Sequence, residues 1–147
     1  MKIAHFLIAA DGSDIKKNFP NAFIAWVDGK KTATIKEFYD EIPNAMHFEE
    51  EPVKNLEVFD AVLNDLQWIE EEQVIVYISN SAEWLSKEKS EEKILAIIDV
   101  LDATAEDWKW VEDDEDIVRK DLKIVFQDSA RIKSLLESQE IPFANLG

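Results

Sequence analysis

The sequence predicts a small α/β domain in which a mainly parallel sheet of three or four strands is flanked by helices, in two or three layers. Two observations support this fold class: short apolar runs alternate with segments of helical periodicity, and turn residues separate them. The third observation is size, because 147 residues with 46% hydrophobic side chains can supply one core. The longest unpatterned stretch is the charged run at 112–116, so we expect residues 1–147 to form a single domain.

Three apolar runs predict buried strands. They are AFIAWV at residues 22–27, VIVYI at 74–78 and LKIVF at 122–126. The first run continues without a polar residue until Asp28-Gly29 ends it, which is typical of a strand covered on both faces. The run at residues 1–10 predicts a further strand, because it is too short to span a bilayer and lacks a clear signal-peptide cleavage site. We expect a turn at 11–14 and a second break around Pro20.

Four segments with helical periodicity follow residues that favour the N-cap position. These N-caps are Thr34, Asn55, Ser90 and Ser129. Glu37 lies three residues after Thr34 and completes a capping box. We expect the first of these helices to end at Ile42, because Pro43 follows it.

The second helical segment, Lys54 to Trp68, has an unusual polar face. Its apolar stripe consists of Leu56, Phe59, Val62, Leu63 and Leu66. Glu57, Asp60, Ala61 and Asn64 recur at the same spacing on another face. Like charges at these spacings destabilise a helix by about 0.2–0.5 kcal/mol per pair. The acidic face therefore favours a basic partner, while a solvated helix face without a partner stays the alternative.

The charge of the chain limits its partners. It has 32 acidic and 16 basic residues, and its formal net charge is −16. This charge repels phosphate backbones and anionic membrane surfaces, so we expect no nucleic-acid or membrane binding. It favours fast, salt-sensitive association with cationic proteins.

Other kinds of site have weaker support in the sequence. The chain has no cysteine, so disulfides and thiolate metal sites are excluded, and three glycines are too few for a phosphate-binding loop. His5 and His47 have no partner at metal-ligand spacing, and the EDDED run lacks the pattern of a calcium loop. Glu57 and Asp60 are placed on an exposed helix face, which does not suit acid–base catalysis. We therefore expect no enzyme, no cofactor and no metal.

Several segments occur in the order that is found in a known family. They are Val27-Asp28-Gly29, Ile35-Lys36-Glu37-Phe38-Tyr39, Asn55-Leu56-Glu57, Leu63-Asn64-Asp65-Leu66 with Trp68, VIVYISN and LKIVF. On these segments the sequence resembles the barstar family, the small acidic intracellular inhibitors of secreted ribonucleases. The resemblance implies a barstar-like core at 22–127, an N-terminal extension at 1–21, and a C-terminal helix and tail at 128–147.

The resemblance also implies a mode of action. In the family, the second helix and the loop before it block the ribonuclease active site with carboxylates that replace RNA phosphates, which Arg binds in the same bidentate way. The resemblance places the family's first helix acid at Glu57, and we expect the partner to be bound by Glu51, Glu57, Asp60, Ala61 and Asn64. Two features depart from the family pattern: Ala61 stands where the second helix acid is expected, and Pro52-Val53-Lys54 replaces an aromatic-Gly step.

Two functions remain open, and an enzyme that acts on a cationic substrate is a weaker third. The first is an inhibitor or immunity protein, a cytoplasmic monomer that neutralises a basic nuclease toxin in a 1:1 complex. The second is a barstar-fold interaction domain that has no nuclease target.

Overall fold

The computed structural model describes residues 4–48, 52–112 and 117–146. Within these residues one five-stranded sheet has the order β2-β3-β4-β1-β5, and every neighbouring pair is parallel. The strands are β1 (Phe6–Ala9), β2 (Phe23–Asp28), β3 (Gln73–Ser79), β4 (Asp121–Gln127) and β5 (Phe143–Asn145). The predicted parallel α/β class is confirmed, but the predicted number of strands is too low. The missed strand is β5, which has only three residues, Phe143–Asn145, and pairs with Phe6, Leu7 and Ile8 of β1.

The connections between the strands are helical, as expected for parallel strands. The helices are α1 (Ser13–Asn18), η1 (Gly29–Lys31), α2 (Ile35–Met46), α3 (Leu56–Asp65), α4 (Glu91–Lys109) and α5 (Ala130–Ser138). All four predicted N-caps are confirmed, because each side chain accepts a hydrogen bond from a backbone N–H in the first turn of its helix. The predicted capping box of Thr34 and Glu37 is also present.

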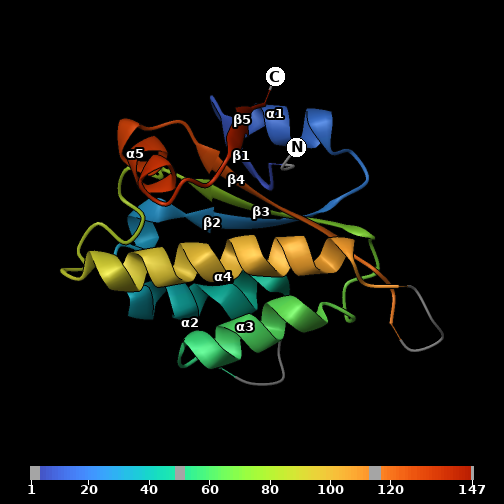
Figure 1. Ribbon diagram of the computed structural model, residues 1–147. Helices are drawn as coiled ribbons and strands as arrows, with labels where there is room; N and C mark the ends of the chain where they lie inside the picture. Colours follow the sequence, from blue (N-terminus) through green and yellow to red (C-terminus); the bar gives the residue numbers. More distant parts are fainter. Residues whose placement is uncertain (1–3, 49–51, 113–116, 147) are drawn as a thin grey trace.

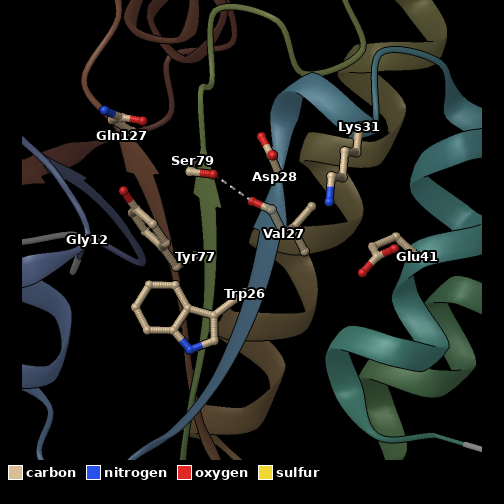
Figure 2. A pocket seen from close by; sticks show the side chains of 9 residues that line it. All are labelled: Gly12, Trp26, Val27, Asp28, Lys31, Glu41, Tyr77, Ser79 and Gln127. Atoms are coloured by element: carbon tan, nitrogen blue, oxygen red, sulfur yellow. Dashed lines mark hydrogen bonds between the residues drawn. The ribbon is translucent and has the colours of Figure 1, made fainter.

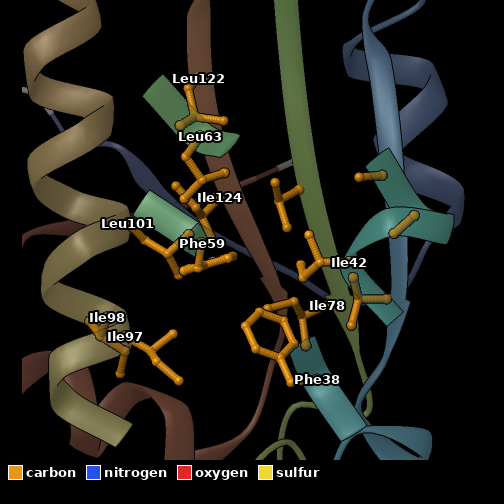
Figure 3. Packing of buried hydrophobic residues seen from close by; sticks show 14 of the residues in the cluster. Phe38, Ile42, Phe59, Leu63, Ile78, Ile97, Ile98, Leu101, Leu122 and Ile124 are labelled. Carbon is orange, nitrogen blue, oxygen red and sulfur yellow. The ribbon is translucent and has the colours of Figure 1, made fainter. Parts of the chain in front are cut away.

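The sheet has helices on both faces, so the domain has three layers (Figure 1). The larger core lies between the sheet and helices α2 to α5, and alternate residues of β3, Val74, Val76 and Ile78, point into it. Figure 3 shows Phe38, Phe59 and Leu101 from three of these helices packed against the strands. The intervening residues Ile75 and Tyr77 belong to a smaller core with Ile15 of α1 on the opposite face.

Two boundaries differ from the sequence predictions. The short helix α1 occupies part of the segment that was predicted to be turn and break, and the wrong prediction reflects its length of only six residues. Helix α2 continues past Pro43 to Met46, because Ala45 and Met46 are buried and their packing outweighs the backbone hydrogen bond that proline cannot donate.

Strand β2 is also less covered than its sequence predicts. It pairs with β3 alone and forms one edge of the sheet, and Trp26 is 43% exposed on the face that carries α1. The apolar run at 22–27 therefore belongs to an edge strand that is covered on one face and partly open on the other.

The N-terminal segment is part of the sheet. Strand β1 confirms the strand predicted at residues 1–10 and lies between β4 and β5, hydrogen-bonded on both sides. His5, just before β1, is buried, and its Nε2 lies 2.7 Å from Oε2 of Glu106 on α4. Among the helices that the structure describes, none is long and apolar enough to cross a membrane.

Candidate partner-binding site

Helix α3 is positioned by contacts at both of its ends. At its start, Oδ1 of Asn55 accepts a hydrogen bond of 2.9 Å from the backbone N–H of Val58. At its end, the indole N–H of Trp108 on α4 donates to the carbonyl oxygen of Leu63 at 2.9 Å, which satisfies one of the carbonyls that the last turn of a helix leaves unpaired. The predicted stripe faces the core, with Phe59, Val62, Leu63 and Leu66 buried and Leu56 half-buried.

The opposite face of α3 is exposed as the sequence predicts. Glu57, Asp60, Ala61 and Asn64 are all exposed. Glu57 lies in the first turn, where the positive end of the helix dipole favours a carboxylate. The structure thus brings four of the five predicted binding residues onto one face of one helix, and their role in binding stays a prediction.

The carboxylate of Asp60 is held in place by two neighbours. The side-chain amide of Asn64 donates to Oδ1 of Asp60 at 2.7 Å and to its backbone carbonyl at 2.8 Å. The hydroxyl of Thr104 on α4 donates to the same Oδ1 at 3.5 Å. Asn64 and Asp60 are one helical turn apart, so their contact is recognisable in the sequence, whereas Thr104 is 44 positions away and had no sequence signal.

The loop before α3 shows the second departure from the family pattern. Glu51 lies outside the described residues. Pro52 and Lys54 are exposed, and Val53 is buried. Together with residues of α2 they line a cavity of about 360 Å³, whose full lining is Ile35, Lys36, Tyr39, Asp40, Pro52, Val53 and Lys54. The surface beside the start of α3 is therefore a partly apolar hollow whose charged side chains are Lys54 and the ion pair of Lys36 with Asp40.

The carboxyl-terminal edge of the sheet is a further place to look, because open α/β sheets bind ligands there. A cavity of about 420 Å³ lies at this edge (Figure 2), lined by Gly12, Trp26, Val27, Asp28, Lys31, Glu41, Tyr77, Ser79 and Gln127. Two of its polar side chains are engaged by Asn80, which donates from its backbone to Oε1 of Gln127 at 2.7 Å and from its side chain to Oδ1 of Asp28 at 2.9 Å. These hydrogen bonds tie β2, β3 and β4 together at their ends.

The two histidines have structural contacts. The hydrogen bond from His5 is the largest cause that lowers the pKa of Glu106 to about 2, and the indole of Trp110 adds a second at 3.2 Å. His47 ends α2 in the left-handed conformation, with φ of 55°. Within the described ranges no three His, Cys, Asp or Glu side chains are grouped so that they could hold a metal ion.

Three tryptophans in the second half of the chain differ in their exposure. Trp84 and Trp108 are buried, whereas Trp110 is 74% exposed at the end of α4. The exposed ring lies beside Lys109, whose ammonium is 5.7 Å from the ring centroid.

Comparisons with known proteins support the family and the fold. No curated protein matches the chain. Among solved structures, the ORC2 protein of Aeropyrum pernix, in complexes with ADPNP and ADP, has a TM-score of 0.53 and 12% sequence identity. The match covers 96% of this chain but only 41% of the ORC2 chain, so it shows a shared fold alone. The family model "Barstar (barnase inhibitor)" matches residues 22–127, the range that the resemblance predicted and well over half of the chain. The chain belongs to the barstar family.

Proposed function

We propose that this protein is an inhibitor that binds a basic ribonuclease, or a related nuclease toxin, through α3 and the loop before it. The observation that carries the proposal is the exposed acidic face of α3, on which the Asp60 carboxylate is held by Asn64 and Thr104. A carboxylate that is already fixed loses less conformational entropy when a partner's Arg or Lys binds it. Membership of a family described as barnase inhibitors supports the same function.

The net charge of −16 supports the choice of a cationic partner. Charge complementarity accelerates encounter with a basic protein, and added salt screens this attraction. We expect a 1:1 complex that weakens steeply as the salt concentration rises, and a cytoplasmic site of action that protects the cell from the nuclease.

The position of Ala61 bears on which nuclease is bound. Ala61 is exposed, so no carboxylate stands one helical turn after Glu57 on this face. Asp60 lies about 100° around the helix from Ala61 and is directed toward α4, where Thr104 contacts it. We propose that the partner docks at an angle shifted toward α4 and that it is a nuclease other than barnase.

The test is an inhibition assay with purified ribonucleases. A panel of basic bacterial ribonucleases that includes barnase is titrated with the wild-type protein, and residual RNA cleavage and complex stoichiometry are measured. For the nuclease that is inhibited, Glu57→Ala and Asp60→Ala should each weaken binding by about 2–5 kcal/mol, the range for a truncated charge pair at an interface. The matched control is Glu91→Ala with Glu92→Ala, which removes two exposed carboxylates from the first turn of α4.

The control variant should inhibit nearly as well as wild type. Equal inhibition by wild type and by the Glu57/Asp60 double variant would exclude α3 as the binding site. The alternative function, a barstar-fold interaction domain without a nuclease target, predicts no inhibition of any ribonuclease in the panel.

A further inference from the structure

A cavity of about 420 Å³ lies at the amino-terminal edge of the sheet, away from the exposed face of α3. Its lining consists of Phe23, His47, Trp68, Ile69, Glu70 and Glu71. These residues come from three places: the first residue of β2, the residue that follows α2, and the turn that leads from α3 to β3. The volume lies within the range of about 300–1,000 Å³ that is usual for small-ligand sites.

Three of the lining side chains are aromatic, and their positions are fixed by neighbours. The rings of Phe23 and His47 meet edge to face, with centroids 5.1 Å apart and planes at 87°. Trp68 packs against Phe48 at 4.8 Å, and its indole N–H donates to the carbonyl oxygen of Met46 at 2.8 Å. A ring whose position is already fixed binds a cation without further loss of side-chain entropy.

The other polar members of the lining are carboxylates. Glu70 is exposed and Glu71 is half-buried, and among the described residues neither carboxylate has a hydrogen bond or an ion pair. No Lys or Arg lines the cavity. The ammonium of Lys120 is buried and donates to the backbone carbonyls of Ile69 and Glu71, at 2.6 Å and 2.8 Å, so it holds this turn in place. Its positive charge also attracts the Glu71 carboxylate at longer range.

A second cavity of about 390 Å³ provides a contrast within the same molecule. It is lined by His5, Lys109, Trp110, Arg119, Asp121 and Lys123. Both cavities contain tryptophan, but basic side chains predominate in this one and only acidic side chains carry charge in the other. Basic side chains thus accompany the tryptophan in this second cavity, whereas carboxylates accompany the tryptophan in the cavity beside Trp68.

We propose that the cavity formed by Phe23, His47, Trp68 and Glu70-Glu71 binds a guanidinium group. A guanidinium is the cation that suits both parts of the lining, because it stacks flat on aromatic rings and donates paired hydrogen bonds to carboxylates. An ammonium group of lysine makes only point contacts, and a neutral urea group lacks the charge. The group can belong to a free arginine-like molecule or to an arginine side chain of a protein, and the experiment distinguishes these sources.

The test is an NMR titration of the full-length protein that follows backbone amide shifts. The ligands are free arginine, a Gly-Arg-Gly peptide, lysine, and citrulline, the neutral analogue of arginine with nearly the same shape. Arginine, free or in the peptide, should shift the amides of the lining residues, and citrulline should bind at least about tenfold more weakly because it cannot make charge-assisted hydrogen bonds. Tighter binding of free arginine assigns a small-molecule ligand, and tighter binding of the peptide assigns a protein side chain; both results support the proposal.

Two variants separate the contributions of charge and rings. Glu70→Gln with Glu71→Gln should weaken arginine binding at least about tenfold by removing both carboxylates. His47→Asn removes a ring while asparagine accepts the left-handed backbone, and it should weaken binding several-fold. The matched control is Glu137→Gln with Glu140→Gln, which removes two exposed charges near the end of α5 and should leave binding unchanged.

The proposal is overturned if arginine and citrulline bind equally, if the Glu70/Glu71 variant binds arginine as wild type does, or if no lining amide shifts. Thermal unfolding of each variant shows whether it is folded. Neither nuclease nor the face of α3 enters the experiment, so its failure leaves the proposed inhibition untouched.

Discussion

Two tryptophans of the core differ in whether the indole N–H has a hydrogen-bond partner. Trp108 donates to the carbonyl oxygen of Leu63 in the last turn of α3, where helix carbonyls lack partners within the helix. Trp84 is fully buried, and its indole Nε1 has no hydrogen-bond partner. Among the described residues, no other buried side-chain nitrogen or oxygen lacks one. An unpaired buried polar group destabilises the fold by about 1–3 kcal/mol. The packing of Trp84 against Phe38 and Phe126 outweighs this effect.

Replacement of each tryptophan by phenylalanine should therefore have unequal effects. Both changes remove a similar volume, but Trp108→Phe leaves the Leu63 carbonyl unpaired, whereas Trp84→Phe removes an N–H that has no partner. We expect Trp108→Phe to lower the free energy of unfolding by about 1–3 kcal/mol more than Trp84→Phe does. Urea unfolding of the two variants measures the difference, and equal losses would show that the indole hydrogen bond to Leu63 contributes nothing.

At the candidate site, local sequence patterns predict some contacts of a residue and miss others. Helical spacing predicted that Glu57, Asp60 and Asn64 share an exposed face, because this depends only on the helix period and on which stripe is apolar. The contact between Asp60 and Thr104 was not predictable, since it depends on how α3 packs against α4.

Among the elements, α2 departs most from local rules. Pro43 stands inside the helix, and as a proline it cannot donate a hydrogen bond to the carbonyl one turn earlier. The helix continues because its last turn buries Ala45 and Met46, and because the backbone N–H of Phe48 donates to the carbonyl of Pro43 at 2.9 Å. Tertiary packing here overrides the local preference of the chain.

Pro43→Ala should therefore stabilise the protein. Alanine restores the backbone donor and removes a helix-interior proline, which is unfavourable by about 3 kcal/mol, while the unfolded chain gains flexibility that offsets about 0.4–1 kcal/mol. We expect an increase of about 2–3 kcal/mol in the free energy of unfolding, measured by urea titration. Pro52→Ala, in the exposed loop before α3, is the control and should have the opposite sign. A loss of stability in Pro43→Ala would mean that the proline ring makes packing contacts worth more than the missing hydrogen bond.

At the scale of the whole molecule, the segment before the family match is an interior part of the sheet. Strand β1 lies between β4 and β5, and the ring of Phe6 is fully buried and stacked with Phe126 at a centroid distance of 6.1 Å. The sequence predicted residues 1–21 to be an N-terminal extension of the core. In space, however, β1 covers the edge that β4 would otherwise expose.

Phe6→Ala should consequently destabilise the protein as a core substitution does. We expect a loss of about 3–5 kcal/mol in the free energy of unfolding, similar to the loss from Phe59→Ala in α3, because both rings are fully buried. Val118→Ala, at an exposed position, is the control and should change stability by less than about 0.5 kcal/mol. Urea unfolding checks all three. A loss below about 1 kcal/mol for Phe6→Ala would show that β1 is a detachable appendage rather than part of the core.

The sequence by itself determined the features that depend on near neighbours. It was sufficient for the α/β class, four helix N-caps, four of the five strands and the exposed acidic face of α3, since periodicity and capping involve residues a few positions apart. Only the tertiary structure decided the strand order, the place of β1, the continuation of α2 past Pro43 and the contact of Thr104 with Asp60. These features join residues that are distant in the chain, and their energy comes from burial and packing, which no local pattern contains.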